Sequence, residues 1–169
     1  MDGLAKDGLA ARGPSLAPES PLSPDLGLLF DRHQAHCLAD TPPESLHMMD
    51  RAALAVPAIT FLVLRDGGQP VAMGAIKDLG DGTAELKSMH VLSEARGTGA
   101  AQRMLDGLVQ AARMIAARAV YLETGSQPSF AAARALYARA GFRECAPFAH
   151  YAEDPNSTFM VLELIGPRP

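Results

Sequence analysis

The sequence predicts an α/β protein of the α+β kind, with a mixed, mostly antiparallel central sheet and helices on both of its faces. Two observations lead to this class. Three β-rich runs separated by short Gly/Asp turns lie between residues 59 and 92, and a long amphipathic helix follows them. A strand, another helix and two more strands come next. Because strands occur both before and after long helices, we expect helices to cover the sheet.

The composition is that of one folded domain. A chain of 169 residues with 48% hydrophobic side chains can bury a single sizeable core. The net charge of −4 leaves no excess of basic residues to neutralise a phosphate backbone, which argues against nucleic acid as a partner. Cys37 and Cys145 form no CxxC pair, and no apolar run is long enough for a signal peptide or a membrane span. We therefore expect a cytoplasmic protein that does not bind a membrane.

The N-terminal segment differs from the rest of the chain. Residues 1–24 are rich in Pro, Gly, Ala and Ser without an apolar period, which predicts a disordered or irregular tail outside a domain that spans residues 25–169. The apolar residues that follow lead into DRHQAHCLAD, which predicts a helix ended by Pro42 and Pro43. A second short helix is expected over residues 44–54.

The three β-rich runs predict an antiparallel meander. They read ITFLVLR, PVAMGAIKDL and TAELKSMHVL, with turns at residues 66–68 and 80–82. Side chains alternate between the two faces of a strand. The third run should therefore place Glu85, Lys87, Met89 and Val91 on one face and Leu86, Ser88 and His90 on the other.

The second half of the chain alternates helices and strands. The longest helix is expected within SEARGTGAAQRMLDGLVQAARMIAARA, where apolar residues recur at helical spacing. AVYLETG predicts a strand, and SFAAARALYARAG predicts a helix that stops at Gly141. FRECAPFAHY and STFMVLELI predict two final strands, joined by a turn at residues 154–156.

The turn before the longest helix is the strongest local sign of a ligand. The stretch ARGTGAA, residues 95–101, runs from a strand directly into a helix, so its glycines and the helix N-terminus can present main-chain N–H groups to an anion. A plain strand-to-helix connection is the alternative. A Walker loop is excluded because no Gly-Lys-Ser/Thr occurs, and a dinucleotide fingerprint fails because Gln102 stands where a third small residue belongs.

This turn resembles the R/Q-x-x-G-x-G/A signature of the GCN5-related N-acetyltransferases (GNAT), with Arg96, Gly99 and Ala101 in the defining places. ELKSMHV resembles the family's fourth strand, VYLETG its fifth, and AAARALYARAGF its A-x-x-L-Y-x-x-x-G-F helix and turn. The resemblance covers residues 59–164. TPPESLHMMD, LETGSQPSF and DPNSTFM further resemble a subgroup of small bacterial acetyltransferases. The likeness implies a GNAT-like sheet and an acyl-CoA-dependent N-acyltransferase.

The resemblance implies acetyl-CoA as cosubstrate and no metal. The main chain of Met89, His90 and Val91 would pair with the pantetheine arm. In such proteins the fourth and fifth strands part to admit the thioester, so Glu123 and Thr124 would form the opposite wall. The CoA pyrophosphate would bind the main-chain amides of Arg96, Gly97, Thr98, Gly99, Ala100 and Ala101.

The resemblance also implies two catalytic side chains. Tyr137 stands in the general-acid position, and a tyrosine with an ordinary pKa of about 10 stays protonated at neutral pH. Glu85 lies eleven positions before Arg96, the offset of the catalytic glutamate in the histone-modifying members, and would act as base. The alternatives are a tyrosine that only packs on a buried helix face and a glutamate that only pairs with Lys87.

Two features depart from the family pattern. Phe130 stands seven residues before Tyr137, where the family often has an asparagine that contacts the cofactor. The family's first strand is not recognisable in the proline-rich SLAPESPLSP, so the sheet is expected to lack that strand or to form it irregularly.

The acceptor of such enzymes lies over the sheet, against the first two helices and the last hairpin, which here implicates residues 40–45, His47 and residues 151–159. The resemblance favours direct transfer of acetyl to the primary amine of a small molecule, since no peptide-binding insertion is evident. A non-catalytic acyl-CoA-binding or sensing module is the alternative, and so is transfer of another acyl group or to another acceptor. The exposed final strands leave a homodimer open.

Two other groups of side chains offer alternative sites. His33, His36 and Cys37 recur at helical spacing and could touch one metal, but no carboxylate or second cluster completes a site. Cys145 and His150 have no orienting group nearby for nucleophilic chemistry. Ordinary packing is the better expectation for both groups.

Overall fold

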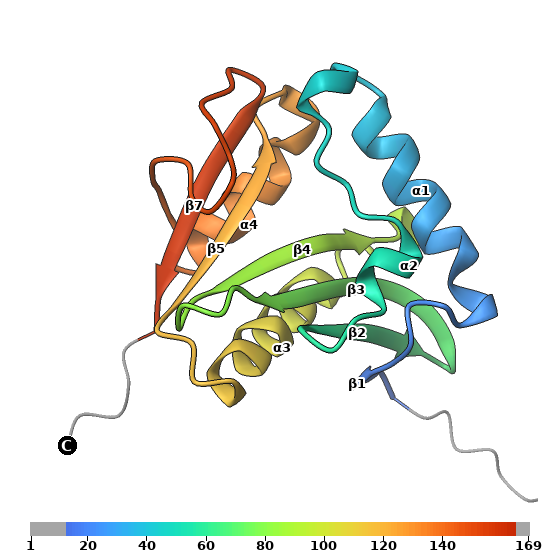
Figure 1. The fold of residues 1–169 in the computed structure, drawn as a ribbon. Coiled ribbons are helices and arrows are strands. Elements are labelled where there is room, and N and C mark those ends of the chain that lie inside the picture. Colours follow the sequence, from blue (N-terminus) through green and yellow to red (C-terminus); the bar gives the residue numbers. More distant parts are fainter. Residues whose placement is uncertain (1–12, 165–169) are drawn as a thin grey trace, which may run out of the picture.

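The computed structural model describes residues 13–164, so residues 1–12 and 165–169 lie outside the description. A seven-stranded mixed sheet forms the centre of the molecule, in the order β1-β2-β3-β4-β5-β7-β6 (Figure 1). The predicted fold class is confirmed. The strands are β1 (Ser15–Pro18), β2 (Ile59–Asp66), β3 (Gln69–Asp78), β4 (Ala84–Val91), β5 (Ala119–Gly125), β6 (Arg143–Glu144) and β7 (Ser157–Glu163), and the helices are α1 (Gly27–Leu38), α2 (Arg51–Leu54), α3 (Ala100–Met114) and α4 (Ala131–Arg139).

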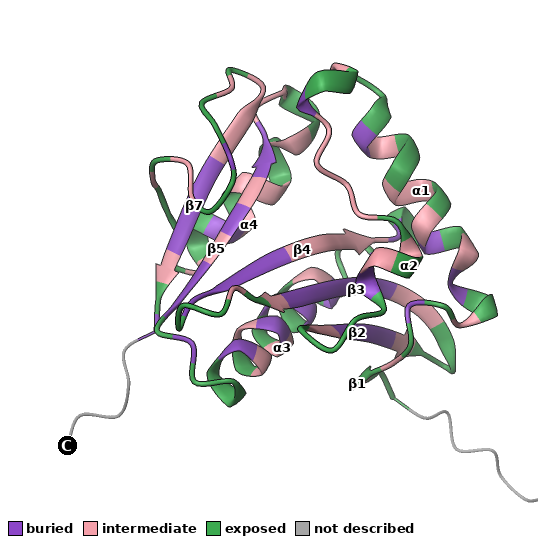
Figure 2. Ribbon diagram, in the orientation of Figure 1, coloured by how far each residue is buried: buried purple, intermediate pink, exposed green. Residues whose placement is uncertain are grey.

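Strands β1 to β4 are antiparallel neighbours, as the alternating runs and glycine turns predicted. Their side chains divide between two layers because consecutive residues point to opposite faces. Leu62 and Leu64 pack with α3, whereas Phe61 and Val63 pack with α1 and α2. Figure 2 shows the resulting pattern of buried strands between partly exposed helices.

The sheet changes direction at its centre. Strand β5 runs parallel to β4, and the connection passes through α3. Only three residue pairs join these strands, ending at Leu86 and Leu122, although each strand continues beyond them. The strands then diverge, so that the sheet opens in a V between β4 and β5 (Figure 1).

The N-terminal boundary differs from the prediction. Residues 15–18, expected to lie in a tail that ended at residue 24, form β1 on the edge of the sheet, paired with β2. Proline is tolerated on an edge strand, so the composition did not exclude one. Arg65 of β2 fixes the following segment through ion pairs to Glu19 and Asp25, each 2.7 Å long. Residues 1–12 of the predicted tail lie outside the described residues.

Two further predicted elements were wrong. The helix expected over residues 44–54 is a 3₁₀ turn (Pro43–Ser45), an extended stretch and then α2, whose N-cap Asp50 accepts a hydrogen bond from the Ala53 N–H at 2.7 Å. The strand expected in FRECAPFAHY is reduced to β6, and the rest is a loop. In this loop, the ring of Phe148 packs on Phe159 of β7 with centroids 6.0 Å apart, so long-range aromatic packing replaces strand pairing.

Helix α3 is the largest single contributor to the core. Its Met104, Leu105 and Leu108 are fully buried against β2, β3 and β4. Gly74 of β3 permits this close approach, because an added Cβ there would lie 2.7 Å from a methyl group of Leu108. No helix among residues 13–164 has the length and apolar character needed to cross a bilayer.

Leu108→Ala should lower the free energy of unfolding by about 2–5 kcal/mol, because it leaves a cavity between α3 and the sheet. Urea unfolding monitored by circular dichroism measures this loss. Met114→Ala, in the same helix but at a side chain that is 88% exposed, is the matched control and should change stability by no more than about 0.5 kcal/mol. Equal losses in the two variants would contradict the assignment of the core.

Candidate active site

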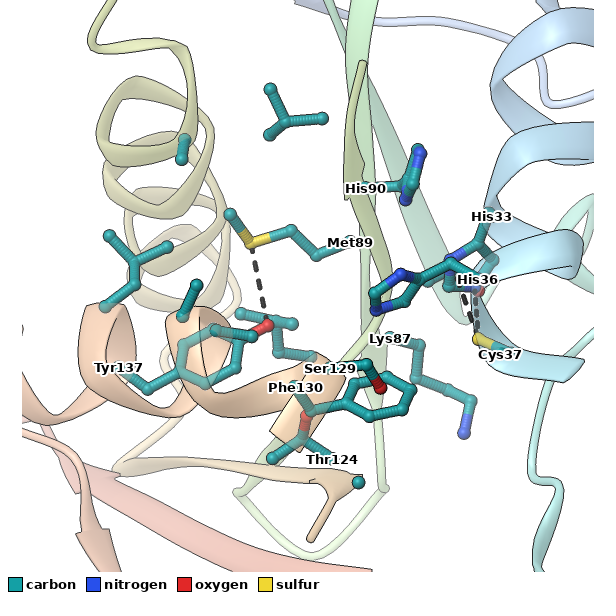
Figure 3. A pocket seen from close by; sticks show the side chains of 18 of the residues that line it. His33, His36, Cys37, Lys87, Met89, His90, Thr124, Ser129, Phe130 and Tyr137 are labelled. Atoms are coloured by element: carbon teal, nitrogen blue, oxygen red, sulfur yellow. Dashed lines mark hydrogen bonds between the residues drawn. The ribbon is translucent and has the colours of Figure 1, made fainter. Parts of the chain in front are cut away.

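A cavity of about 590 Å³ occupies the opening between β4 and β5. Its walls come from α1, the segment after α1, β4, the turn before α3, β5 and α4, so segments far apart in the sequence meet there (Figure 3). All the catalytic and cofactor-binding residues predicted from the sequence line it except Thr98. The separation of two parallel strands therefore creates the one place where the predicted residues converge.

Strand β4 contains a bulge at Ser88. This residue has a φ of 53°, and the pairing register with β3 shifts between Met73 and Ala75. Two residues of β4 then oppose one of β3, which reverses the side-chain alternation. Met89 packs with Leu86 on the α3 side, and His90 lies toward α1 (Figure 3).

The predicted alternation in β4 is therefore wrong beyond Lys87. Met89 and Val91 lie on the face of Leu86 rather than that of Glu85, because one extra residue moves every later side chain to the other face. Beyond Leu86, β4 has no ladder partner on the side of β5. The main chain of Met89, His90 and Val91 thus borders the cavity with an unpaired strand edge, as a partner for an extended amide-bearing chain would require.

The turn before α3 presents an open main-chain surface. Gly97 and Gly99 have φ values of 75° and 82°, in the left-handed region that favours glycine. Gly99 is the N-cap of α3 and provides no capping side chain, so the first N–H groups of the helix have no side-chain partner there. An added Cβ at either glycine would meet no atom within 4 Å. The turn leaves room for an anion against the positive end of a helix dipole.

The residues around this turn differ in their role in it. Thr98 does not line the cavity. Its hydroxyl donates to the Ala95 carbonyl, and this hydrogen bond stabilises the turn. Arg96, Gly97, Ala100 and Ala101 all line the cavity. Across the opening, Thr124 of β5 is buried and forms part of the opposite wall.

Tyr137 of α4 is buried, and its hydroxyl points into the cleft (Figure 3). The hydroxyl donates to Met89 Sδ at 3.9 Å, and a thioether is a weak acceptor. Burial, and secondarily the charge of Glu123, raise the pKa of Tyr137 above its ordinary value. The side chain therefore stays protonated at neutral pH and has a donor that a stronger acceptor could engage.

Glu85 of β4 is fully buried at the narrow end of the V, on the face opposite α3. Its Oε1 accepts hydrogen bonds from Lys87 Nζ at 2.9 Å and from the Tyr151 hydroxyl. Lys87 Nζ also donates to the Tyr151 hydroxyl oxygen at 2.9 Å. Its Oε2 has no hydrogen-bond partner among the described residues. The side chain is thus neither exposed nor simply paired with Lys87, which were the features of the alternative considered from the sequence.

Three histidines meet on the α1 side, and of these the sequence assigned only His90 to the site, through its main chain. The His33 and His36 rings of α1 lie 5.5 and 6.2 Å from the His90 ring of β4, between centroids. Burial, followed by the charge of neighbouring histidines, lowers the pKa of His33 and of His90 to about 4. The spacing of His33 and His36 was visible in the sequence, but their meeting with His90 depends on the bulge.

The metal alternative does not gain support. No group of three or more His, Cys, Asp or Glu side chains within residues 13–164 is arranged to hold a metal ion. Cys37 instead contacts the His33 ring at 3.9 Å, and burial raises the pKa of its thiol to about 11. The thiol is therefore neutral at ordinary pH, which disfavours metal binding.

Phe130, the departure from the family pattern, lies where the β5–α4 connection meets α1. Its ring contacts the His36 ring edge-on at 4.7 Å between centroids, and an added Cβ at Gly125 would lie 2.3 Å from its Cδ2. The neighbouring Ser129 donates to Asp40 Oδ1 at 2.9 Å. An aromatic contact and a hydrogen bond thus connect α1 to the end of β5 across the opening of the V.

The segments expected to hold the acceptor also meet. Asn156 Nδ2 donates to Ser45 Oγ at 3.3 Å, and the His47 and Tyr151 rings contact edge-on with centroids 5.0 Å apart. The segment after α1 and the loop before β7 therefore form one rim of the cavity, next to Glu85.

Residues 28–142 match the Acetyltransferase (GNAT) family. The chain belongs to this family. The expectation of a GNAT acyl-CoA-dependent N-acetyltransferase is thereby confirmed, and with it the fold.

Similar proteins support the same assignment. The chain is 38% identical to the uncharacterized N-acetyltransferase YsnE of Bacillus subtilis, over 80% of this chain and 90% of that protein. It is also 38% identical to the IAA acetyltransferase of Azospirillum brasilense, over 86% of this chain and 95% of that protein. A solved structure from Klebsiella pneumoniae superposes with a TM-score of 0.71 at 27% identity, covering 90% of this chain and 98% of that one.

Gly99→Ala should weaken CoA binding by about tenfold, because a left-handed residue with a Cβ costs about 1–2 kcal/mol and would shift the first amides of α3. Isothermal calorimetry with CoA measures the affinity. Gly68→Ala is the matched control, since Gly68 has a similar φ of 84° in the β2–β3 turn, away from the cavity. We expect similar losses of stability in both variants and a loss of CoA affinity only in Gly99→Ala.

The half-buried His33 and His90 should make stability depend on pH. The unfolded chain binds protons at an ordinary histidine pKa of 6.5, whereas folded His33 and His90 bind them only near pH 4. Since the unfolded state binds more protons between these values, their contribution to stability is complete above pH 6.5 and declines as the pH falls toward 4. His90→Gln should flatten this decline in urea unfolding across the range, whereas His150→Gln, at an exposed position, should preserve it.

Proposed function

We propose that this GNAT enzyme transfers an acetyl group directly from acetyl-CoA to the primary amine of a small molecule. The observation that carries the proposal is the hydroxyl of Tyr137, held protonated in the cleft between β4 and β5 with only a thioether as partner. The Azospirillum relative named as an IAA acetyltransferase supports a small-molecule acceptor. Ser45, His47, Tyr151 and Asn156 form a connected rim along a cavity of about 590 Å³, a volume that suits a compact acceptor.

The main chain provides the proposed cosubstrate site. The amides of residues 96–101 are assigned to the CoA pyrophosphate, because the two left-handed glycines and the N-terminus of α3 suit an anion. The free edge of β4 at Met89, His90 and Val91 is assigned to the amide-bearing pantetheine arm. Thr124 closes the opposite side. Acetyl-CoA supplies the acetyl group as a thioester.

Two side chains are assigned to proton transfer. Glu85 accepts the proton that the amino group loses, directly or through water, because Glu85 lines the cavity and its Oε2 has no donor among residues 13–164. Tyr137 donates its hydroxyl proton to the sulfur as the carbon–sulfur bond breaks and the carbon–nitrogen bond forms. The raised pKa of Tyr137 suits a donor that must stay protonated until that step.

Tyr137→Phe should lower kcat on the order of a hundredfold while leaving CoA affinity within about twofold, because it removes only the hydroxyl and keeps the buried ring. Free-thiol release with a panel of amines gives kcat, and calorimetry gives the affinity. Tyr121→Phe, on β5 outside this cavity, removes the same atom and should leave both values unchanged.

The same measurements separate the two function classes. A sensing module would bind CoA but release no thiol with any amine, and Tyr137→Phe would then change nothing. Full activity in Tyr137→Phe would overturn the assignment of Tyr137 as general acid and leave the proposed acetyl transfer in place.

A further inference from the structure

The acceptor half of the cavity contains a cluster of charged and aromatic side chains, here called the acceptor cluster: Glu85, Lys87, Glu123, His47 and Tyr151. All five line the cavity. Glu85 and Lys87 come from β4 and Glu123 from β5, on the face opposite the α3 core, where the two strands begin to part. His47 and Tyr151 close the cluster from the loops.

The hydrogen bonds of the acceptor cluster leave one strong acceptor free. Lys87 Nζ and the Tyr151 hydroxyl both donate to Glu85 Oε1, and nothing within residues 13–164 donates to Oε2. Glu85 is 1% exposed, so this oxygen lacks bulk water as a substitute partner. A buried carboxylate oxygen without a donor is unfavourable, and an ammonium group is a strong partner for it.

The charges around the cluster favour a cation as well. Burial raises the pKa of Glu123, and the charge of Glu85 adds to this effect, although Ser157, His47 and Lys87 oppose it. A bound positive charge would therefore reduce the repulsion between the two carboxylates. Lys87 already donates to Glu85 and Tyr151, with its Nζ 5.6 Å from the centre of the Tyr151 ring. Asp154, which interacts with His47, adds a further negative charge near the rim.

The cationic residues of the cavity lie elsewhere. Arg96 belongs to the turn before α3, and Arg139 lies at the end of α4, both outside the acceptor cluster. Arg134 of α4 does not line the cavity and donates to the carbonyls of Gly125 and Gln127. Lys87 is therefore the only lysine or arginine in the acceptor cluster, and it is flanked by Glu85 and Glu123.

We propose that the acceptor is a small cationic amine without a carboxylate beside its amino group, and that its ammonium binds Glu85 Oε2 within the acceptor cluster. This inference rests on the proposed function. A carboxylate on the carbon next to the nitrogen would lie against Glu85 and Glu123. Their repulsion of this carboxylate exceeds the attraction of Lys87, which is already paired. Glu123 acts as a specificity-determining residue, because its charge attracts the ammonium without taking part in the proton transfer.

Matched acceptors that differ only in the carboxylate test this inference. Tyramine, tyrosine and tyrosine methyl ester form one series, and agmatine, arginine and arginine methyl ester form another. Thiol release from acetyl-CoA gives kcat/KM for each. We expect the decarboxylated amine to exceed its amino acid by about tenfold or more, and the ester, which keeps the bulk but removes the charge, to recover most of that difference.

The outcomes are distinguishable. A preference for the free amino acids, lost in the esters, would overturn the inference and make Lys87 a carboxylate anchor, while leaving the proposed acetyl transfer in place. Equal values within each series would also overturn it. No thiol release from any of these or other amines would instead overturn the proposed function, and the inference with it.

Glu123→Gln gives an independent test with the preferred amine of the series. It should raise KM by about fivefold or more with little change in kcat, and Glu123→Asp should recover part of the loss. Glu163→Gln, on β7 and exposed, is the matched control and should leave KM unchanged. An unchanged KM in Glu123→Gln would exclude its charge from acceptor selection.

Discussion

The early separation of β4 from β5 is the constraint on which the rest of the structure depends. Parallel pairing stops at Leu86 and Leu122, so the remaining main-chain groups along the gap lack strand partners, a situation tolerated where water or a ligand reaches them. Two features maintain the gap. The bulge at Ser88 redirects β4, and seven antiparallel residue pairs with β7 hold β5 on its own course. The cavity, the free edge of β4 and the exposed turn before α3 follow from this separation.

Much of the fold could be predicted because the spacing of apolar residues along the sequence follows which side chains are buried. The meander alternates core residues such as Leu62 and Val63 between two faces, and α3 repeats Met104 and Leu108 at helical spacing. The segments that were mispredicted depend on distant contacts. His47 packs on Tyr151, more than a hundred residues away, so residues 46–50 stay extended despite a helix-like composition. Such a contact has no signature in a local window.

The site divides in the same way. The turn at residues 95–101 and the helix of Tyr137 are local motifs, so their resemblance to the family was sufficient to assign both to one site, and both line the cavity. The bulge was not predictable, because Ser88 adopts a positive φ without a glycine or asparagine to mark it. Its consequences reach furthest: it brings Met89 to Tyr137 and His90 to His33. The partners of Glu85 likewise required Tyr151, which follows it by 66 residues.

The two halves of the cavity use different chemistry. The half assigned to the cosubstrate relies on main-chain groups and on backbone shape, which glycines at 97 and 99 and the N-terminus of α3 determine. The acceptor half relies on side chains, which can be exchanged without altering the sheet, so the fold can retain its acyl donor while its acceptor changes. Glu85 illustrates the energetic consequence. A carboxylate oxygen buried without a donor disfavours the folded state, and the apolar contacts of α3 with the sheet offset it. The stability of one face thus permits a polar, incompletely bonded site on the other.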